Sequence, residues 1–121
     1  MLVRELISTQ VVSVSPHDTI AVARDRLRAH QIHHLLVIDA NTVVGVLAMR
    51  NLAGKPDGTP VGDVMTREVA AIDADATLPR AASLMIRGTT GCLPVLEAGK
   101  LAGIITTTDL MRVLNADMTL S

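Results

Sequence analysis

The sequence contains no phenylalanine, tyrosine or tryptophan, although 49% of its 121 residues are hydrophobic. Any core of this chain must therefore consist of aliphatic side chains, alanine and six methionines. A flat ligand has no aromatic ring on which to stack. Because proteins that bind single-stranded nucleic acid usually stack its bases on aromatic side chains, we expect no nucleic-acid partner.

The sequence also has little net charge of either sign, and its formal charge at pH 7 is −1. This near balance disfavours a surface that binds polyanions. One local cluster is basic, but its two-residue spacing distributes the side chains around the circumference of a helix. We interpret this cluster as a solvated helix face; its members are Arg24, Arg26 and Arg28.

The chain has a single cysteine, Cys92, which excludes an internal disulfide framework and a cysteine-based zinc site. Residues 1–10 lack the apolar stretch of a secretory signal peptide. No segment approaches the ~18 consecutive apolar residues of a membrane-spanning helix. We therefore expect a cytoplasmic protein that does not contact a membrane.

What the chain does contain is one pattern written twice, at an offset of 58 residues and without a gap. Thr19-Ile20 recurs as Thr77-Leu78, and Gly45-Val46-Leu47 recurs as Gly103-Ile104-Ile105. A fixed internal period indicates a supersecondary unit that buries its apolar face against a copy of itself. The sequence thus predicts two similar structural repeats.

Each repeat is predicted to contain a short helical turn, a strand, a helix, two strands and a second short helix. We expect an α/β fold of two pseudo-symmetric β-α-β-β-α repeats, residues 1–58 and 59–121, packed through their sheets. Thr19 and Thr77 are the predicted N-caps of the longer helices. The predicted strands are 11–14, 35–38, 43–48, 93–96 and 101–106, and the predicted short helices are 50–53 and 109–114.

The second repeat carries a short signature in which a glycine and an apolar strand precede a threonine, two variable residues, an aspartate and an apolar residue. It reads Gly103-Ile104-Ile105-Thr106-Thr107-Thr108-Asp109-Leu110, and Leu93-Pro94-Val95 precedes it. The doubled unit with this signature resembles a tandem pair of the CBS domain family, named for cystathionine β-synthase and often called a Bateman module. The resemblance covers about residues 3–53 and 61–114.

The resemblance implies a stand-alone regulatory, energy-sensing module. Such a module binds an adenosine-containing ligand, namely AMP, ADP, ATP or S-adenosylmethionine, in the cleft between the repeats. It then signals to an effector protein, which the sequence does not identify.

The chemistry of two signature residues fits that role. The Asp109 carboxylate can accept hydrogen bonds from both vicinal hydroxyls of a ribose. Thr106 lies at a strand-to-helix junction, where backbone N–H groups attract anions, and its hydroxyl adds a donor for a phosphate. Thr107 and Thr108 either assist or cap the helix. The alternative interpretation is that Thr106 and Asp109 are themselves ordinary capping residues.

The walls of the pocket are predicted from the resemblance by position. In the family, they come from the first strand and from the segments that precede the second strand of each repeat. The residues at these positions, together with one on the signature strand, are Thr9, Val11, Val12, Ile32, His33, His34, Gly91, Cys92 and Ile104.

The two repeats differ at the positions that carry the chemistry. Ala48 stands where the second repeat has Thr106, and Asn51 stands where it has Asp109. Ala48 lacks the hydroxyl, and Asn51 is neutral and offers a single carbonyl, although Arg50 can contribute a phosphate contact. We therefore predict one favoured site in the second repeat. The site in the first repeat, at Ala48, Arg50 and Asn51, is predicted to be weak, degenerate or empty.

Three of the four histidines, His30, His33 and His34, are close together in the first repeat. Their spacing would suit a metal only on a continuous helix, and the predicted helix ends before His33. With no cysteine or carboxylate to complete a ligand set, we expect no metal site and interpret the histidines as pocket-lining or solvent-exposed. If they lie near a bound phosphate, ligand affinity falls as the pH rises through ~6.5.

No Ser/His/Asp or Cys/His arrangement occurs at a defined spacing, and Cys92 is interpreted as a small buried hydrophobe. We therefore expect no enzyme activity and no catalytic residue or catalytic cofactor. The rival to a ligand-binding module is a ligand-free scaffold that forms homodimers. Tandem pairs of the family commonly associate through their helices, so a homodimer is expected under either interpretation.

Overall fold

The protein is described by a computed structural model that divides into two compact units. It describes residues 1–67, 69–88 and 90–120, with the side chains of 116–120 left out. Unit 1 consists of Met1–Gln10 and Ala70–Ser121, and unit 2 consists of Val11–Val69. The boundaries of the compact units thus differ from those of the sequence repeats. The first ten or so residues of each repeat belong to the unit that contains the rest of the other repeat.

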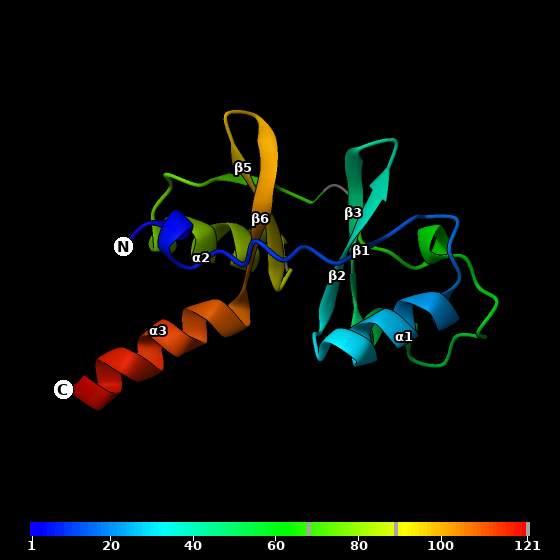
Figure 1. The fold of residues 1–121 in the computed structure, drawn as a ribbon. Helices are drawn as coiled ribbons and strands as arrows, with labels where there is room; N and C mark the ends of the chain where they lie inside the picture. The colour runs from blue at the N-terminus through cyan, green and yellow to red at the C-terminus, as the bar shows by residue number, and fades with distance from the viewer. Residues whose placement is uncertain (68, 89, 121) are drawn as a thin grey trace. The chain divides into compact units, whose positions relative to one another are not determined.

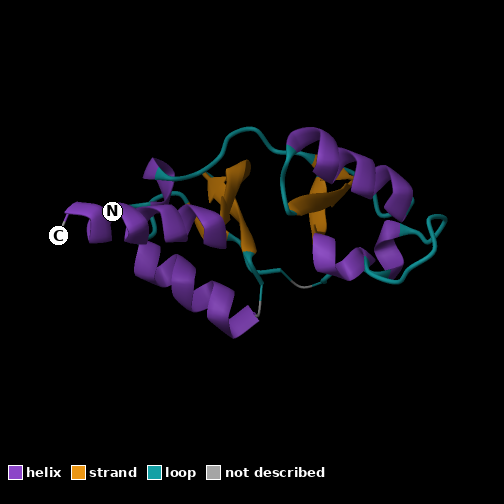
Figure 2. Cartoon of the chain, turned by 90° about the horizontal axis from the view of Figure 1, so that it is seen from below, coloured by secondary structure: helices purple, strands orange, loops and turns teal. Residues whose placement is uncertain are grey.

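Unit 2 contains one three-stranded sheet in the order β1-β2-β3 (Figure 1). Strand β1 runs parallel to β2, and β2 and β3 form an antiparallel hairpin. Helices flank the strands (Figure 2). The elements are β1 (Ser13–Val14), α1 (Ile20–His30), β2 (His34–Asp39), β3 (Thr42–Ala48) and the 3-10 helices η2 (Met49–Leu52) and η3 (Val61–Asp63).

Unit 1 repeats this plan with a sheet in the order β4-β5-β6, so the expected α/β fold of two similar repeats is confirmed. Even the register is shared: Val95 lies opposite Gly103 as Val37 lies opposite Gly45. The elements are the 3-10 helix η1 (Val3–Glu5), β4 (Ile72–Asp73), α2 (Leu78–Gly88), β5 (Cys92–Glu97), β6 (Lys100–Thr106) and α3 (Thr107–Leu120).

The N-caps of the longer helices form where the sequence predicts them. Thr19 Oγ1 accepts a hydrogen bond from Val22 N at 3.4 Å, and Thr77 Oγ1 accepts one from Arg80 N at 3.3 Å. Each hairpin closes through two residues of positive φ, the geometry that follows the right-handed twist of the strands. These turn residues are Ala40 (φ 50°), Asn41 (66°), Ala98 (51°) and Gly99 (76°).

Element lengths differ from the prediction at three places. The strand predicted over 11–14 shortens to Ser13–Val14, because only these two residues pair in register with β2. The short helix after β3 is a 3-10 helix over Met49–Leu52, one residue earlier than predicted. The last helix is longer than the predicted 109–114, since α3 runs from Thr107 to Leu120.

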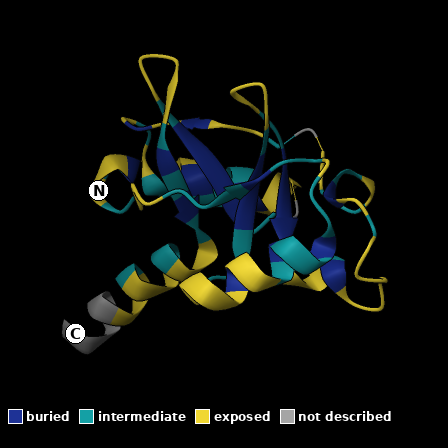
Figure 3. Ribbon diagram, turned by 45° about the vertical axis from the view of Figure 1, so that its right-hand side comes forward, coloured by how far each residue is buried: buried dark blue, intermediate teal, exposed yellow. Residues whose placement is uncertain are grey.

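Each unit has its own apolar cluster, built from one helix face and the strands beside it (Figure 3). Burying each of these aliphatic side chains contributes about 1.5–3 kcal/mol before the opposing chain entropy is counted. The fully buried members in unit 2 include Ile20, Ala23, Leu35, Val37, Leu47 and Val61. Those in unit 1 include Val3, Ala81, Leu93, Val95 and Ile105.

The buried valines Val3 and Val61 belong to the exchanged segments, residues 1–10 and 59–69, which each repeat contributes to the other unit. These segments are also held by backbone hydrogen bonds. Ser8 and Ile104 exchange two such bonds in unit 1, both at 3.0 Å. Thr66 and Val46 form the same pair in unit 2, at 2.9 and 3.0 Å. The backbones approach so closely because a glycine precedes each strand residue of the pair. At Gly103 an added Cβ would overlap the Ser8 carbonyl oxygen, and at Gly45 it would lie 2.8 Å from Thr66 O.

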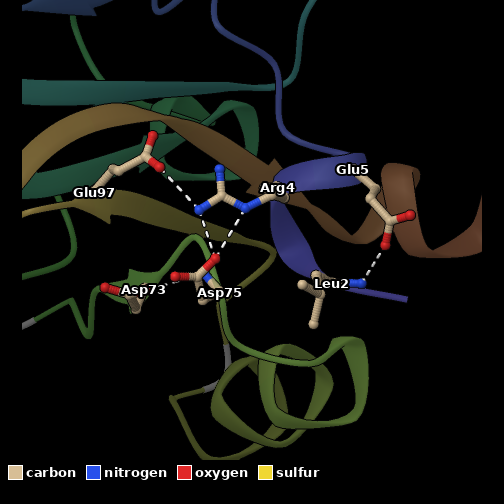
Figure 4. A network of polar contacts seen from close by, with 6 residues as sticks. All are labelled: Leu2, Arg4, Glu5, Asp73, Asp75 and Glu97. Carbon is tan, nitrogen blue, oxygen red and sulfur yellow. Dashed lines mark hydrogen bonds and ion pairs between the residues drawn. The ribbon is translucent and has the colours of Figure 1, made fainter.

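The first segment of unit 1 has an additional polar anchor (Figure 4). The Arg4 guanidinium donates to Asp75 Oδ1 from Nε at 2.9 Å and from Nη2 at 2.5 Å, and to Glu97 Oε1 at 2.8 Å. These carboxylates raise the pKa of Arg4 above its ordinary value. The equivalent of Arg4 in unit 2 is Gly62, so this ion-pair cluster belongs to unit 1. Its groups are exposed, and its part in the stability is correspondingly small.

Candidate functional site

The signature threonine and aspartate meet where β6 passes into α3. Asp109 Oδ2 accepts hydrogen bonds from Thr106 N at 2.8 Å and from Thr106 Oγ1 at 3.1 Å. In return, Thr106 Oγ1 accepts one from Asp109 N at 3.4 Å. This reciprocal arrangement is a capping box, which satisfies backbone N–H groups at the start of a helix. The capping interpretation of the two residues is therefore realised in the structure.

Capping occupies only one oxygen of the Asp109 carboxylate. The other, Oδ1, faces Arg112 Nη1 at 3.8 Å, which is beyond hydrogen-bond distance. The Asp109 side chain is 14% exposed, so this negative group is largely, but not wholly, buried. Carboxylate oxygens of this kind accept hydrogen bonds from hydroxyl groups, and Oδ1 keeps lone pairs for that purpose.

Cys92 lies directly opposite Thr106 in the β5–β6 pair and is fully buried. Burial raises the pKa of the Cys92 thiol to about 12, with a smaller contribution from the Asp109 carboxylate. At neutral pH the thiol is therefore protonated, and it packs as a small apolar group. This agrees with the interpretation made from the sequence.

The segment that leads into β5 is fixed by two groups. Gly91 O accepts a hydrogen bond from Thr107 N at 2.9 Å. Thr90 Oγ1 donates to Cys92 O at 3.0 Å and accepts from Cys92 N at 3.4 Å. Sequence reasoning missed Thr90, because a threonine in a short loop gives no periodic or motif signal.

The other predicted residues of unit 1 lie around this junction. Thr107 and Thr108 are exposed in the first turn of α3, and Ile104 is half-buried on β6. Thr9 is exposed and follows Ser8, which pairs with Ile104. The remaining wall residues belong to unit 2, and their part in the site stays a prediction; they are Val11, Val12, Ile32, His33 and His34.

The corresponding junction of unit 2, where β3 ends, keeps one arm of the capping box. Asn51 Oδ1 accepts a hydrogen bond from Ala48 N at 2.8 Å, as the Asp109 carboxylate does for Thr106 N. Ala48 offers no hydroxyl, so the other bonds of the box are lost. The amide of Asn51 therefore supports the backbone without a charge.

His34 lies opposite Ala48 in the β2–β3 pair and is half-buried. Burial lowers the pKa of His34 below its ordinary value, and the nearby His33 and Arg50 lower it further. As for metals, no group of three or more His, Cys, Asp or Glu side chains in the described ranges is arranged to hold an ion.

Two copies of one α/β unit, each with a strand-to-helix junction closed by a side-chain acceptor, define a tandem-repeat module. The family model described as "CBS domain" matches residues 3–57 and 61–116. The chain therefore belongs to the CBS domain family and contains a tandem pair of its domains. In the described part of the chain, every helix falls short of the length and apolar character that crossing a membrane requires.

Relatives agree with this assignment. CBS domain-containing protein YhcV of Bacillus subtilis is 30% identical over 114 residues, which cover 89% of this chain and 81% of that protein. A crystal structure of CBS domain, NE2398, has a TM-score of 0.86 at 29% identity and covers 94% of this chain and 97% of its own. The CBS domain pair of protein MJ0100, solved in complex with 5′-methylthioadenosine and S-adenosyl-L-methionine, shares the fold: its TM-score is 0.87 at 23% identity, over 97% and 98% of the two chains.

Similarity to enzymes is confined to part of their length. Inosine-5′-monophosphate dehydrogenase of Korarchaeum cryptofilum is 34% identical over 101 residues, but the match covers 21% of that enzyme against 82% of this chain. The likeness therefore concerns one portion of that protein.

Proposed function

We propose that this CBS pair is a regulatory module, not an enzyme, and that it binds an adenosine-containing ligand at the Thr106–Asp109 junction of unit 1. The ligand class comprises AMP, ADP, ATP and S-adenosylmethionine. The bound state is passed on to an effector protein by a shift of population between two forms of the module. Because the ligand binds the native state alone, it also raises the stability of the fold.

One observation carries the proposal: unit 1 has more polar groups at its junction than the fold requires. Asn51 in unit 2 satisfies the junction backbone with a single neutral acceptor. Unit 1 adds a hydroxyl, a charge and a second carboxylate oxygen, all in a largely buried position. A ribose diol is the partner that fits Asp109 Oδ1. The adenosyl compounds bound by the MJ0100 pair, which has the same fold, support this ligand class.

The decisive variant is Asp109→Asn, because Asn51 provides an internal example of an amide in the same capping role. The amide keeps the acceptor for Thr106 N but replaces the carboxylate oxygen that would face the ribose. We expect affinity for the adenosyl ligand to fall by about tenfold or more, with stability nearly unchanged. Asp25→Asn, on the exposed surface of α1, is the matched control for losing one negative charge.

The measurement is calorimetric titration with each of the four ligands, since the chain has no tyrosine or tryptophan for an intrinsic optical signal. The proposal fails if none of the four binds the native protein at millimolar concentration. It also fails if Asp109→Asn binds as tightly as the native protein.

A specific observation favours a second candidate, a scaffold that self-associates without a ligand. Helices α2 and α3 of unit 1 pack on one another and expose apolar side chains: Ile86, which is 77% exposed, with Met111 and Leu114. The equivalent positions of the first repeat are Arg28, Ala53 and Pro56. Exposed apolar side chains that form a contiguous patch are typical of interaction surfaces. Sedimentation of the native protein beside Ile86→Glu tests for a dimer, and a dimer without any adenosyl binding identifies a scaffold.

A further inference from the structure

The linker between the two repeats supplies acceptors for the first turn of α1. The first N–H groups of a helix have no partner within the helix itself. In α1, Ile20 N donates to Thr59 O at 2.9 Å. Ala21 N donates to Asp57 O at 3.2 Å, and the next N–H group donates to the side chain of the N-cap threonine. Two of these three groups therefore depend on the backbone of residues 57–59.

Unit 1 lacks this dependence at the second position of its own helix. The first N–H group of α2, that of Leu78, donates to Met1 O at 3.3 Å. The next residue, Pro79, stands at the position of Ala21 and has no N–H group that would require an acceptor. A hydrogen bond such as that to Asp57 O is therefore needed in unit 2 and not in unit 1.

Asp57 and Gly58 are the central residues of a tight, exposed turn. Thr59 N donates to Pro56 O at 3.0 Å and closes this turn. The Asp57 side chain is 76% exposed, and a Cβ added to Gly58 would meet nothing within 4 Å. No side chain on Gly58 hinders the approach of its N atom to the carboxyl carbon of Asp57. In the sequence, Asp57 is the only aspartate followed by glycine, and no asparagine is followed by one.

We propose that Asp57-Gly58 is a site of spontaneous isoaspartate formation, whose rate is limited by the ion pair between Asp57 and Arg24. Gly58 N gives up its proton and bonds to Asp57 Cγ, and one oxygen of the side-chain carboxyl leaves as water. In the resulting cyclic imide, Gly58 N is bonded to both Cγ and the backbone C of Asp57. Solvent water then breaks the bond to the backbone C, so that the chain continues through Cγ and the former backbone carbonyl becomes a carboxylate. One water molecule leaves and one enters, and the mass of the chain is unchanged.

Arg24, on α1, restrains the group that reacts. Its Nη1 donates to Asp57 Oδ1 at 2.6 Å, and its own side chain is 28% exposed. The carboxyl group must turn toward Gly58 N and lose an oxygen, so this contact has to open first. An exposed ion pair slows a step that requires its opening by about threefold. The surface of α1 therefore sets the rate at which the linker is modified.

The product changes the start of α1. An isoaspartyl linkage adds one methylene to the backbone between Pro56 and Gly58, so the turn cannot close with its former geometry. Asp57 O, the acceptor for Ala21 N, then belongs to a carboxylate that is no longer part of the backbone. The modification loosens the first turn of α1 in unit 2, whereas the helix start of unit 1 is left as it was. The inference is independent of the ligand proposed for unit 1.

The experiment follows the full chain during incubation for several weeks at neutral pH and physiological temperature. Mass spectrometry with electron-transfer fragmentation distinguishes isoaspartate from aspartate at each position. We expect Asp57 to be converted at least about tenfold faster than the exposed Asp25 and Asp39, which are followed by arginine and alanine. In the converted chain, hydrogen exchange at Ala21 N should be about fivefold faster, with that at Leu78 N unchanged.

Two variants separate the reaction from its restraint. Gly58→Ala keeps the fold because its added Cβ has space, and we expect at least about tenfold less isoaspartate. Arg24→Gln frees the carboxyl group and should raise the rate about threefold. Arg28→Gln removes an exposed charge from the same helix and is the matched control, in which the rate stays that of the native chain.

The site is overturned if Asp57 stays unmodified in the native chain over a period in which the urea-unfolded chain is converted. It is also overturned if Gly58→Ala reacts as fast as the native chain. Conversion of Arg24→Gln at the native rate would refute the restraint by the ion pair. Equal acceleration of exchange at Ala21 N and Leu78 N would refute a local effect on α1. These outcomes do not depend on adenosyl binding, so failure here is distinguishable from failure of the proposed function.

Discussion

The two units have nearly the same fold, but they cap the helix that follows each hairpin differently. In unit 2 the amide of Asn51 accepts one backbone hydrogen bond, and the neighbouring Ala48 contributes nothing from its side chain. In unit 1 the Asp109 carboxylate accepts two, and Thr106 accepts a third. The simpler junction shows how little the fold needs. What unit 1 has beyond that minimum is the part that the proposed function assigns to ligand binding.

The sharpest test of structural equivalence concerns the two glycines of the close backbone approach. Gly103→Ala sets a Cβ against the backbone of Ser8, and Gly45→Ala sets one against Thr66 O and the Met65 side chain. We expect losses of about 3 and about 2 kcal/mol of unfolding free energy, respectively. Urea denaturation followed by circular dichroism measures both. Gly58→Ala, which meets nothing within 4 Å, is the control and should be nearly neutral. Neutral behaviour of Gly103→Ala would contradict the docking of residues 1–10 in unit 1.

Removing the capping acceptors should cost less unfolding free energy than the glycine substitutions do, and again more in unit 1 than in unit 2. Asp109→Ala loses two acceptor contacts in a largely buried position, and we expect a loss of about 2 kcal/mol. Asn51→Ala loses one, with an expected loss of about 1 kcal/mol. The same urea experiments provide the values. Equal losses would mean that the additional bonds of unit 1 do not stabilise the junction.

A further expected difference appears only in alkaline solution and belongs to unit 1. The folded state raises the pKa of Cys92 from 9.0 to about 12, so its stabilising effect is complete below pH 9 and is lost as the pH rises toward 12. At pH 10 the unfolding free energy should be lower by about 1.4 kcal/mol than at pH 8 on this account. Cys92→Ala, compared by its pH slope rather than its absolute stability, should lack this decline. An unchanged slope in that variant would assign the decline to other groups.

Most of the fold follows from the sequence by local signals that act within a few residues. Thr19 and Thr77 cap their helices as predicted, and the two hairpins close at the predicted turns. The exchange of the first segments could not be predicted in this way. The periodic apolar pattern shows that Val3 and Val61 are buried, but the two repeats are so alike that it does not say in which copy.

At the β6–α3 junction, the sequence identifies residues and offers capping as one interpretation, but it does not give the pattern of hydrogen bonds. The signature identifies Thr106 and Asp109, whereas their mutual capping geometry depends on where β6 ends and α3 begins. Thr90 has no signal in the sequence. His34 and Arg50 have no common signal in the sequence, because their shared junction requires the register that sets His34 opposite the end of β3.

The division of the chain has a consequence for the order in which the protein is made. Unit 2 is continuous, so it can close as soon as Val69 has left the ribosome. Unit 1 joins residues 1–10 to a sheet whose last strand ends about a hundred positions later. At typical rates of synthesis of about 5–20 residues per second, the apolar first segment waits for several seconds for its partner. During this interval one half of the newborn protein is native, and the other still exposes Val3 to chaperones and to neighbouring chains.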